Sequence, residues 1–318
     1  MPLTIAVTGA DGFIGRNLCT ELAGRGHRVR RLVRTAGTAE PDCRAVGDLA
    51  VAESLERQLE GAAAVVHLAA RAHVLRETEP DPAAAFARAN VDATLRLARA
   101  SVAAGVRRFV FVSSIGVNGS RTAGRAFTED DEPAPTGPYA SSKLQAELAL
   151  RREFPASLEL VVVRPSLVYG PGVKGNLHRL LALIDSGLPL PLGSLDNRRN
   201  LIGVENLSDL IAACIERREA AGELFLAAEP RIHSTPGLLR AMAAAMHRSA
   251  RLFDFPVGLL RGAASCLGAR GQFDRLCDSL EVSSRKASER LAWIPRVSFE
   301  DGIARTAASF REGRHDGR

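Results

Sequence analysis

The hydrophobic pattern at the N-terminus predicts a strand, a turn and a helix in close succession. The apolar run from Leu3 to Val7 is typical of a buried strand. Ile14, Leu18 and Leu22 then recur at helical spacing, which predicts an amphipathic helix beginning just after the turn. The chain therefore opens with the unit from which parallel α/β sheets are built.

The same alternation continues through the first half of the chain. Further strands are expected at residues 29–33, 44–46, 64–68 and 107–113, with helices between them. This order predicts the α/β class, with a Rossmann-type, doubly wound parallel sheet over residues 1–165. Ligands of such sheets bind at the carboxyl ends of the strands, so residues at these ends are the first candidates for a site.

After residue 165 the pattern changes, and it predicts a smaller α/β C-terminal substrate lobe over residues 166–310, interleaved with the first domain. The apolar stretch 253–267 predicts core packing or a subunit contact, and residues 311–318 predict a flexible tail. The other expected elements of this lobe are helices at 176–186, 207–217 and 236–247, a strand at 223–227 and a loop at 187–197.

Composition limits the cellular setting. The chain has 318 residues, of which 46% are hydrophobic, enough for one large domain or two unequal ones. No apolar run approaches eighteen residues and no charged leader precedes an apolar block, so we expect neither membrane insertion nor export. The five cysteines are scattered without a Cys-x-x-Cys pair, which predicts neither disulfides nor a metal site and indicates a cytoplasmic location.

The formal net charge of +6 comes almost entirely from arginine, since lysine occurs only at Lys143, Lys174 and Lys286. The arginines are dispersed and are not interleaved with aromatic residues, so nucleic acid is not an expected partner. Anionic small molecules such as nucleotides are compatible with this charge.

Three glycines follow the first strand, Gly9, Gly12 and Gly15, and the turn also contains Phe13 and Ile14. Glycines at this place permit a tight turn and a close approach by a pyrophosphate, which the N-terminus of the following helix attracts. The spacing is Gly-x-x-Gly-x-x-Gly, and its strand–turn–helix setting favours dinucleotide binding over an ordinary glycine turn.

The end of the second strand bears on the choice of cofactor. An acidic residue there binds the ribose 2′-hydroxyl of NAD, whereas an arginine accommodates the 2′-phosphate of NADP. Glu21 is the only acidic residue between Asp11 and Glu40, and it lies within the first helix. Arg34, aided by Arg31, therefore favours NADP(H), with NAD(H) as the alternative.

Two further strand ends supply cofactor candidates. Asp48 and Leu49 follow the third strand, and Asp48 is expected either to cap the next helix or to accept a hydrogen bond from the adenine amino group. Ala69 and Ala70 follow the fourth strand, where small residues allow close approach by a cofactor. His67 just before them is expected to pack beneath the site rather than act as a base.

Tyr139 and Lys143 are four residues apart in a helix predicted to begin at Pro138, so their side chains share one face. A nearby ammonium group is expected to lower the pKa of the Tyr139 phenol and to allow proton exchange with a substrate hydroxyl. Ser114, at the end of the fifth strand, is placed to hydrogen-bond the same oxygen.

Together these motifs resemble the extended short-chain dehydrogenase/reductases, and within them the branch of nucleotide-sugar epimerases and dehydratases. The resemblance covers most of the chain. The matching segments are Thr8-Gly9-x-x-Gly12-x-x-Gly15, Ser114 with Tyr139-x-x-x-Lys143, Arg164 to Gly172, Arg199 to Leu207, Ser284 to Ala287 and Leu291 to Pro295.

The resemblance implies a role for each matching residue. Tyr139 would be the acid/base, Lys143 would hold the nicotinamide ribose, and Ser114 would orient the substrate oxygen. Arg199 would contact the nucleotide diphosphate, for which a guanidinium fork is suited. The remaining candidates that it implies are Pro165 for the cofactor and Lys174 and Asn176 for the substrate.

Two departures from the family narrow the activity. Ile115 and Gly116 occupy the place where the 4,6-dehydratases carry an Asp-Glu pair, so the elimination lacks its acid and base. Asn118 stands where many 4-epimerases carry a tyrosine, which favours the 4-keto-reductases of surface-polysaccharide sugars.

We therefore expect an NAD(P)-dependent enzyme acting at C4 of a nucleoside-diphosphate sugar, preferably a 4-keto-sugar reductase. A UDP-sugar 4-epimerase with bound NAD is the close alternative, and a non-catalytic NADP-sensing regulatory protein is an alternative of another class. The family resemblance also makes a homodimer compatible, through helices within residues 90–104 and 139–152.

Overall fold

The computed structural model describes residues 2–35, 42–72 and 79–315. Its elements are β1 Thr4–Thr8, α1 Phe13–Gly24, β2 Arg28–Val33, β3 Cys43–Ala45, α2 Leu55–Leu59, β4 Ala64–His67, α3 Pro82–Ala87, the π-helix η1 Arg88–Asp92, α4 Ala93–Ala103, β5 Arg108–Val112, the 3-10 helix η2 Ile115–Val117, α5 Pro138–Glu153, β6 Glu159–Pro165, β7 Leu167–Tyr169, α6 Asn176–Asp185, β8 Arg199–Gly203, α7 Val204–Glu216, the 3-10 helix η3 Arg218–Ala220, β9 Leu224–Ala227, β10 Ile232–His233, α8 Thr235–Ala245, α9 Val257–Cys266, α10 Arg270–Cys277, α11 Arg285–Leu291 and α12 Phe299–His315.

Seven parallel strands form the main sheet, in the order β3-β2-β1-β4-β5-β6-β9. The order reverses between β1 and β4, where the chain returns to the centre of the sheet and builds outward in the other direction. This arrangement confirms the doubly wound Rossmann-type fold, and the reversal is the point at which such sheets bind ligands.

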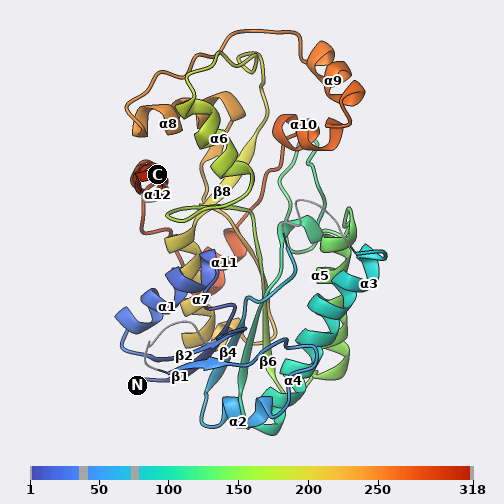
Figure 1. The fold of residues 1–318 in the computed structure, drawn as a ribbon. Coiled ribbons are helices and arrows are strands. Elements are labelled where there is room, and N and C mark those ends of the chain that lie inside the picture. The colour runs from blue at the N-terminus through green and yellow to red at the C-terminus, as the bar shows by residue number, and fades with distance from the viewer. Residues whose placement is uncertain (1, 36–41, 73–78, 316–318) are drawn as a thin grey trace.

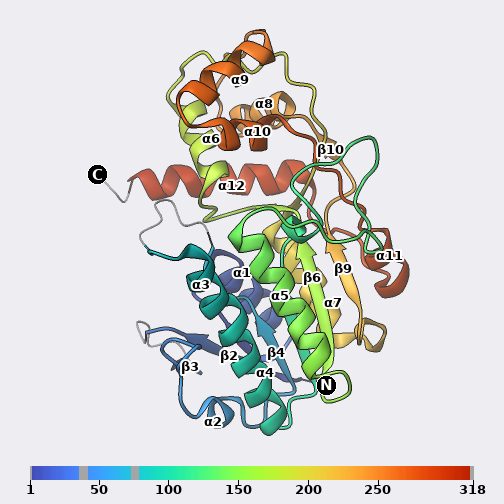
Figure 2. The same cartoon turned by 90° about the vertical axis from the view of Figure 1, so that its right-hand side faces the viewer.

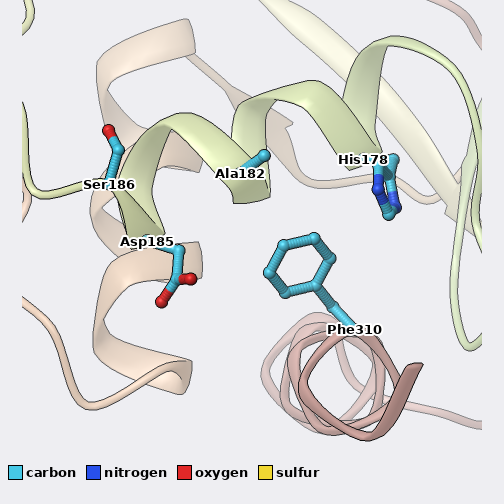
Figure 3. A pocket seen from close by; sticks show the side chains of 5 residues that line it. All are labelled: His178, Ala182, Asp185, Ser186 and Phe310. Carbon is cyan, nitrogen blue, oxygen red and sulfur yellow. The ribbon is translucent and has the colours of Figure 1, made fainter. Parts of the chain in front are cut away.

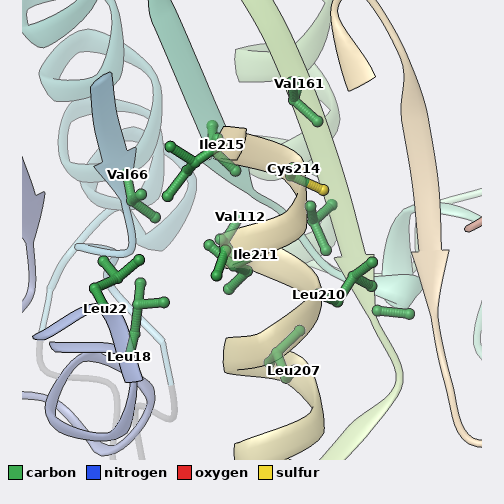
Figure 4. Packing of buried hydrophobic residues seen from close by; sticks show 14 of the residues in the cluster. Leu18, Leu22, Val66, Val112, Val161, Leu207, Leu210, Ile211, Cys214 and Ile215 are labelled. Atoms are coloured by element: carbon green, nitrogen blue, oxygen red, sulfur yellow. The ribbon is translucent and has the colours of Figure 1, made fainter. Parts of the chain in front are cut away.

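Helices cover both faces of the sheet, as Figures 1 and 2 show. The strands are buried on both sides, so successive residues enter different cores: Ile5 and Val7 pack toward α1 and α7, and Ala6 packs toward α2 and α4. On the first face, α1 packs against α7, and Leu18 and Ile211 belong to the same buried cluster (Figure 4). Both faces are therefore closed, and the carboxyl edge of the sheet remains for a ligand.

A second lobe stands over that edge (Figures 1 and 2). It contains a small sheet in the order β10-β8-β7 together with helices α6, α8, α9, α10 and α12. Phe13, the first residue of α1, packs against the core cluster of this lobe, which includes Tyr169 and Phe299. The start of the glycine-turn helix therefore lies between the two lobes.

The chain crosses between the lobes more than once. After β8, α7 returns to cover the main sheet, and β9 completes that sheet by pairing with β6. Helix α12 runs to His315, five residues into the segment for which the sequence predicts a tail, and residues 316–318 lie outside the described part. Across residues 2–35, 42–72 and 79–315, none of the helices combines the length and apolar character that a membrane span requires.

One apolar segment is arranged differently from the expected core packing. Within the stretch 253–267, α9 buries none of its residues, and Leu259 and Leu267 are 63% and 81% exposed. The prediction of core packing for this stretch is wrong, because an apolar run does not show which neighbours the fold brings to it. A subunit contact at this place stays a prediction.

Candidate active site

The glycine turn after β1 has a geometry that only glycine permits at two positions. Gly9 has a φ of +65°, and a Cβ there would lie 2.9 Å from the Ala69 nitrogen. A Cβ on Gly15 would lie 2.1 Å from the Gly9 carbonyl oxygen. Gly12 closes the turn by donating from its N–H to the same oxygen at 3.0 Å. The missing side chains leave the backbone and the N-terminus of α1 accessible to a pyrophosphate.

The predicted cofactor residues lie at the carboxyl ends of strands in the same sheet as β1, of which β2 and β4 are its direct neighbours. Arg34 is exposed after β2, Ala69 and Ala70 follow β4, and Pro165 ends β6. Arg31 reaches the turn itself, with its Nη2 3.5 Å from the Ala10 carbonyl oxygen. The fold thus brings distant candidates to one edge, and these residues and the glycine turn fit a dinucleotide.

The structure excludes one of the two roles expected for Asp48. Its carboxylate accepts from the Ala50 N–H at 3.0 Å within a short turn. Leu49, the middle residue of this turn, is buried in the core. Helix α2 begins later, with Ser54 at its N-cap position. The prediction that Asp48 caps this helix is therefore wrong, because the chain makes a separate turn before the helix begins. Its expected contact with adenine stays a prediction.

His67 is a structural residue beneath the site, as predicted. Its two ring nitrogens lie 2.7 Å from Thr8 Oγ1 and 2.9 Å from Thr94 Oγ1. Burial, with a smaller contribution from the charge of Lys143, lowers the pKa of His67 to about 3. The ring is therefore neutral near pH 7 and ties β1 to α4 through β4.

Asn90 connects two segments that approach the site. It lies in η1, accepts from the Arg71 N–H at 2.7 Å and donates to Ser142 Oγ at 2.9 Å. Ser142 in turn donates to the Tyr139 carbonyl at 2.8 Å. Asn90 therefore ties the loop after β4 to α5, through Ser142 and the carbonyl of Tyr139.

Ser114 and Tyr139 meet at the carboxyl edge of the sheet. Ser114 is the N-cap of η2, and its Oγ accepts from the Gly116 N–H at 3.1 Å. Burial raises the pKa of Tyr139 to about 12, while a hydrogen bond with Ser114 lowers it by a smaller amount. The ring of Phe86 packs edge-on against Tyr139, with 6.3 Å between the ring centroids.

Lys143 lies one turn after Tyr139 and is 1% exposed. Its Nζ sits 4.1 Å from the centroid of the Phe111 ring. Burial lowers the pKa of Lys143 to about 7, and the Glu147 carboxylate acts in the opposite direction. The expected lowering of the Tyr139 pKa is therefore not found: both groups are shielded from solvent, and burial also destabilises the charged form of Lys143.

A buried polar cluster lies beneath Tyr139 and Lys143, and none of the sequence motifs predicts it. Glu147 pairs with Arg164 at 2.5 Å, and the two side chains are 3% and 4% exposed. Ser113 donates to Glu147, and Arg164 donates to Asn118 Oδ1 at 2.9 Å. The available signal is the spacing Lys143-x-x-x-Glu147, which places a carboxylate on the buried face of the catalytic helix.

The predicted substrate residues other than Ser114 lie on the second lobe. Lys174 and Asn176 are exposed around the start of α6. Arg199 begins β8, and its guanidinium donates to the carbonyls of Asp278, at 2.9 Å, and of Arg275. Arg199 thus joins β8 to the end of α10, and its contact with a diphosphate stays a prediction.

Two cavities lie away from these candidates. One, of about 350 Å³, lies between α6 and α12 and is lined by His178, Asp185 and Phe310 among others (Figure 3). The second, of about 330 Å³, is lined by Glu147 and Arg164 together with residues of β9 and the loop near Glu129. No predicted site residue lines either of these two cavities.

Comparison with known proteins decides the family. A model described as the NAD dependent epimerase/dehydratase family matches residues 5–228. The chain belongs to this family. A relative from Vibrio cholerae named UDP-glucose 4-epimerase is 36% identical over 98% of this chain and 96% of its own length. The resemblance to the extended short-chain dehydrogenase/reductases is confirmed, and the chain is an enzyme of this type.

Solved structures of the family share the architecture over nearly the whole chain. MoeE5, in complex with UDP-glucuronic acid and NAD, has a TM-score of 0.77 at 27% identity and covers 98% of this chain and 99% of its own. DesIV, a dTDP-glucose 4,6-dehydratase from Streptomyces venezuelae with NAD bound, has a TM-score of 0.78 at 26% identity and covers 98% of each chain. These neighbours of the epimerase/dehydratase family bind NAD.

Proposed function

We propose that this protein is a UDP-sugar 4-epimerase that works with a bound NAD(H). The observation that carries this proposal is the 36% identity, over 98% of the chain, to a relative named UDP-glucose 4-epimerase. Solved structures of comparable length that carry NAD support the cofactor. The proposal changes the preference drawn from sequence motifs, which favours a reductase.

The chain's own residues supply the proton chemistry. The glycine turn from Gly9 to Gly15 would hold the NAD, and the nicotinamide would supply a reversible hydride acceptor for C4 of the sugar. Tyr139 takes the proton from the C4 hydroxyl and gives it back, and Ser114 holds that oxygen by a hydrogen bond. Burial raises the phenol pKa of Tyr139 to about 12. The protonated form of Lys143, one helical turn away, would favour the phenolate and so act against this effect of burial.

Dehydration of the sugar is not supported by the residues beside Ser114. Ile115 is apolar and 6% exposed, and Gly116 contributes only its N–H, which Ser114 Oγ accepts at 3.1 Å. Neither residue can donate or accept the proton that an elimination requires. Epimerisation and carbonyl reduction need only the Ser114, Tyr139 and Lys143 set.

Arg34 favours a second candidate, a 4-keto-sugar reductase that uses NADP(H). It is exposed just after β2, where a guanidinium can meet a 2′-phosphate. Asn118 is consistent with this candidate, since it is buried against Arg164 where many 4-epimerases of the family carry tyrosine.

Turnover assays separate these candidates. An epimerase converts UDP-glucose to UDP-galactose with no net change in nicotinamide absorbance, and a reductase consumes NADPH in proportion to a 4-keto sugar nucleotide. Tyr139→Phe should lower kcat by about 10²- to 10⁴-fold in either case, because it removes the proton carrier. Cofactor binding should survive, since the ring and its contact with Phe86 remain.

The control is Tyr169→Phe, which changes the other tyrosine of the chain, buried in the second lobe and hydrogen-bonded to Glu229. It should reduce stability while leaving kcat nearly unchanged. Unchanged turnover in Tyr139→Phe would remove the catalytic assignment. A protein that binds the cofactor and turns over neither class of substrate would contradict both candidate functions.

A further inference from the structure

The buried cluster beneath Lys143 joins the two segments that carry the catalytic candidates. Glu147 Oε1 accepts from the Ser113 hydroxyl and from Arg164 Nε at 3.1 Å, and Oε2 accepts from Arg164 Nη2 at 2.5 Å. Each of these three side chains belongs to a residue that is at most 4% exposed. One carboxylate on α5 thus holds the end of β5 and the end of β6 together.

The position of the carboxylate links it to both catalytic residues. Ser113 immediately precedes Ser114, so its hydrogen bond to Glu147 restrains the backbone that presents the Ser114 hydroxyl. Lys143 lies one helical turn before Glu147 on the same buried face. We propose that Glu147, fixed by its ion pair with Arg164, is a positioning residue that keeps Ser114 in place through Ser113 and presents its negative charge to Lys143.

The groups around Lys143 explain why this carboxylate matters. Tyr139 and Glu147 lie on the same face of its helix. His67 of β4, which is neutral near pH 7, and the ring of Phe111 of β5 also lie close to it. Burial lowers the pKa of Lys143, and Glu147 is the group that raises it. Loss of this negative charge would leave a buried lysine that releases its proton at a lower pH.

Arg164 fixes the orientation of the Glu147 carboxylate. Its guanidinium contacts both oxygens of Glu147 and also donates to Asn118 Oδ1, and Asn118 in turn donates to the Thr128 carbonyl at 3.1 Å. An ion pair that is fully removed from water requires such additional hydrogen bonds. The cluster is therefore a rigid support that ends at the loop after η2.

The test compares Glu147→Gln with Glu153→Gln on the same helix. Glutamine keeps the size of the side chain and an oxygen for the Ser113 hydroxyl, but it removes the charge. Glu153 is paired with Arg99 at the surface, so its replacement controls for a charge change on α5. The inference rests on the proposed function through the role of Lys143, so two readouts are measured: turnover of UDP-glucose and the affinity for NADH as a function of pH.

We expect Glu147→Gln to lower kcat about tenfold or more with little change in KM. The pH above which NADH affinity declines should move down by about one unit, since Lys143 is expected to contact the cofactor and loses its proton earlier. Glu153→Gln should change neither quantity. If Glu147→Gln folds and retains both the kcat and the pH midpoint of the wild type, the proposal is wrong.

A second variant covers the case in which Glu147→Gln does not fold. Ser113→Ala removes one hydroxyl, leaves the ion pair of Glu147 with Arg164 intact, and should lower kcat without moving the pH midpoint. An unchanged kcat in Ser113→Ala would overturn the link to Ser114. If the wild-type protein turns over no nucleotide sugar, the proposed function fails, while the pH dependence of NADH affinity still decides whether Glu147 acts on the protonation of Lys143.

Discussion

Replacement of Gly15 by alanine tests the glycine turn most directly. The added Cβ would lie 2.1 Å from the Gly9 carbonyl oxygen, 2.7 Å from Ala10 Cα and 2.9 Å from the Ala10 carbonyl carbon. All three are backbone atoms of the turn, so no side chain can rotate away to make room. The turn must therefore move away from α1, and with it the backbone groups proposed to hold the pyrophosphate.

The size of the effect follows from these distances. Overpacking a rigid site costs about 1–3 kcal/mol, and three backbone contacts place Gly15→Ala at the upper end of that range. If the displaced turn loses a similar amount of binding free energy, NADH affinity falls about 100-fold, since about 1.4 kcal/mol corresponds to tenfold. Gly24→Ala is the matched control, because a Cβ at this last residue of α1 meets nothing within 4 Å.

The assay measures stability and binding in the same samples. Urea unfolding can be followed by the fluorescence of Trp293, the only tryptophan, which is 3% exposed. Gly24→Ala should leave NADH affinity unchanged and stabilise the protein by about 0.5 kcal/mol through its better helix propensity. The reasoning is refuted if Gly15→Ala unfolds at the wild-type urea concentration and binds NADH within about threefold of wild type.

Two further predictions concern buried polar groups. Because burial lowers the pKa of Lys143 to about 7, the unfolded chain binds a proton between pH 7 and 9 that the folded protein does not. The free energy of unfolding of the wild type should therefore rise with pH relative to that of Lys143→Met, by at most about 1.4 kcal/mol per pH unit. Urea titrations at pH 7 and 9 measure this difference. If the free energies of the two proteins change with pH by the same amount, the prediction is contradicted. Trp293→Phe should destabilise the protein by about 1–3 kcal/mol, because Asp209 loses the indole N–H that now donates to it at 2.8 Å. Urea unfolding followed by circular dichroism measures this change. An unchanged unfolding midpoint would show that the ion pairs of Asp209 with Arg25 and Arg296 compensate fully.

The fold of the first domain follows closely from the sequence, because buried parallel strands leave continuous apolar runs. The run at residues 3–7 corresponds to β1, and the helical spacing from Ile14 to Leu22 lies within α1. The strands of the second lobe are less evident in the sequence. Its strands β7 and β10 have three and two residues, too few to show a period, and β8 contains polar Arg199 and Asn200.

The candidate site shows the same division between local pattern and environment. Helical spacing places Tyr139 and Lys143 on one face, as α5 confirms. Spacing does not show how deeply that face is buried, and burial reverses the expected direction of the Tyr139 pKa. The partners of Glu147 come from β5 and β6, so no local motif reveals that its carboxylate meets Ser113 and Arg164.

The return of the chain to the main sheet at β9 limits how the second lobe can be exchanged, in evolution or by protein engineering. β9 pairs with β6 through four residue positions, after the chain has already built part of the second lobe. A cut at residue 165 would leave β6 as a bare edge with unpaired N–H and carbonyl groups, which invites aggregation. The substrate lobe therefore cannot be exchanged as a simple C-terminal module: a graft must carry α7 and β9 with it and match their packing on the sheet.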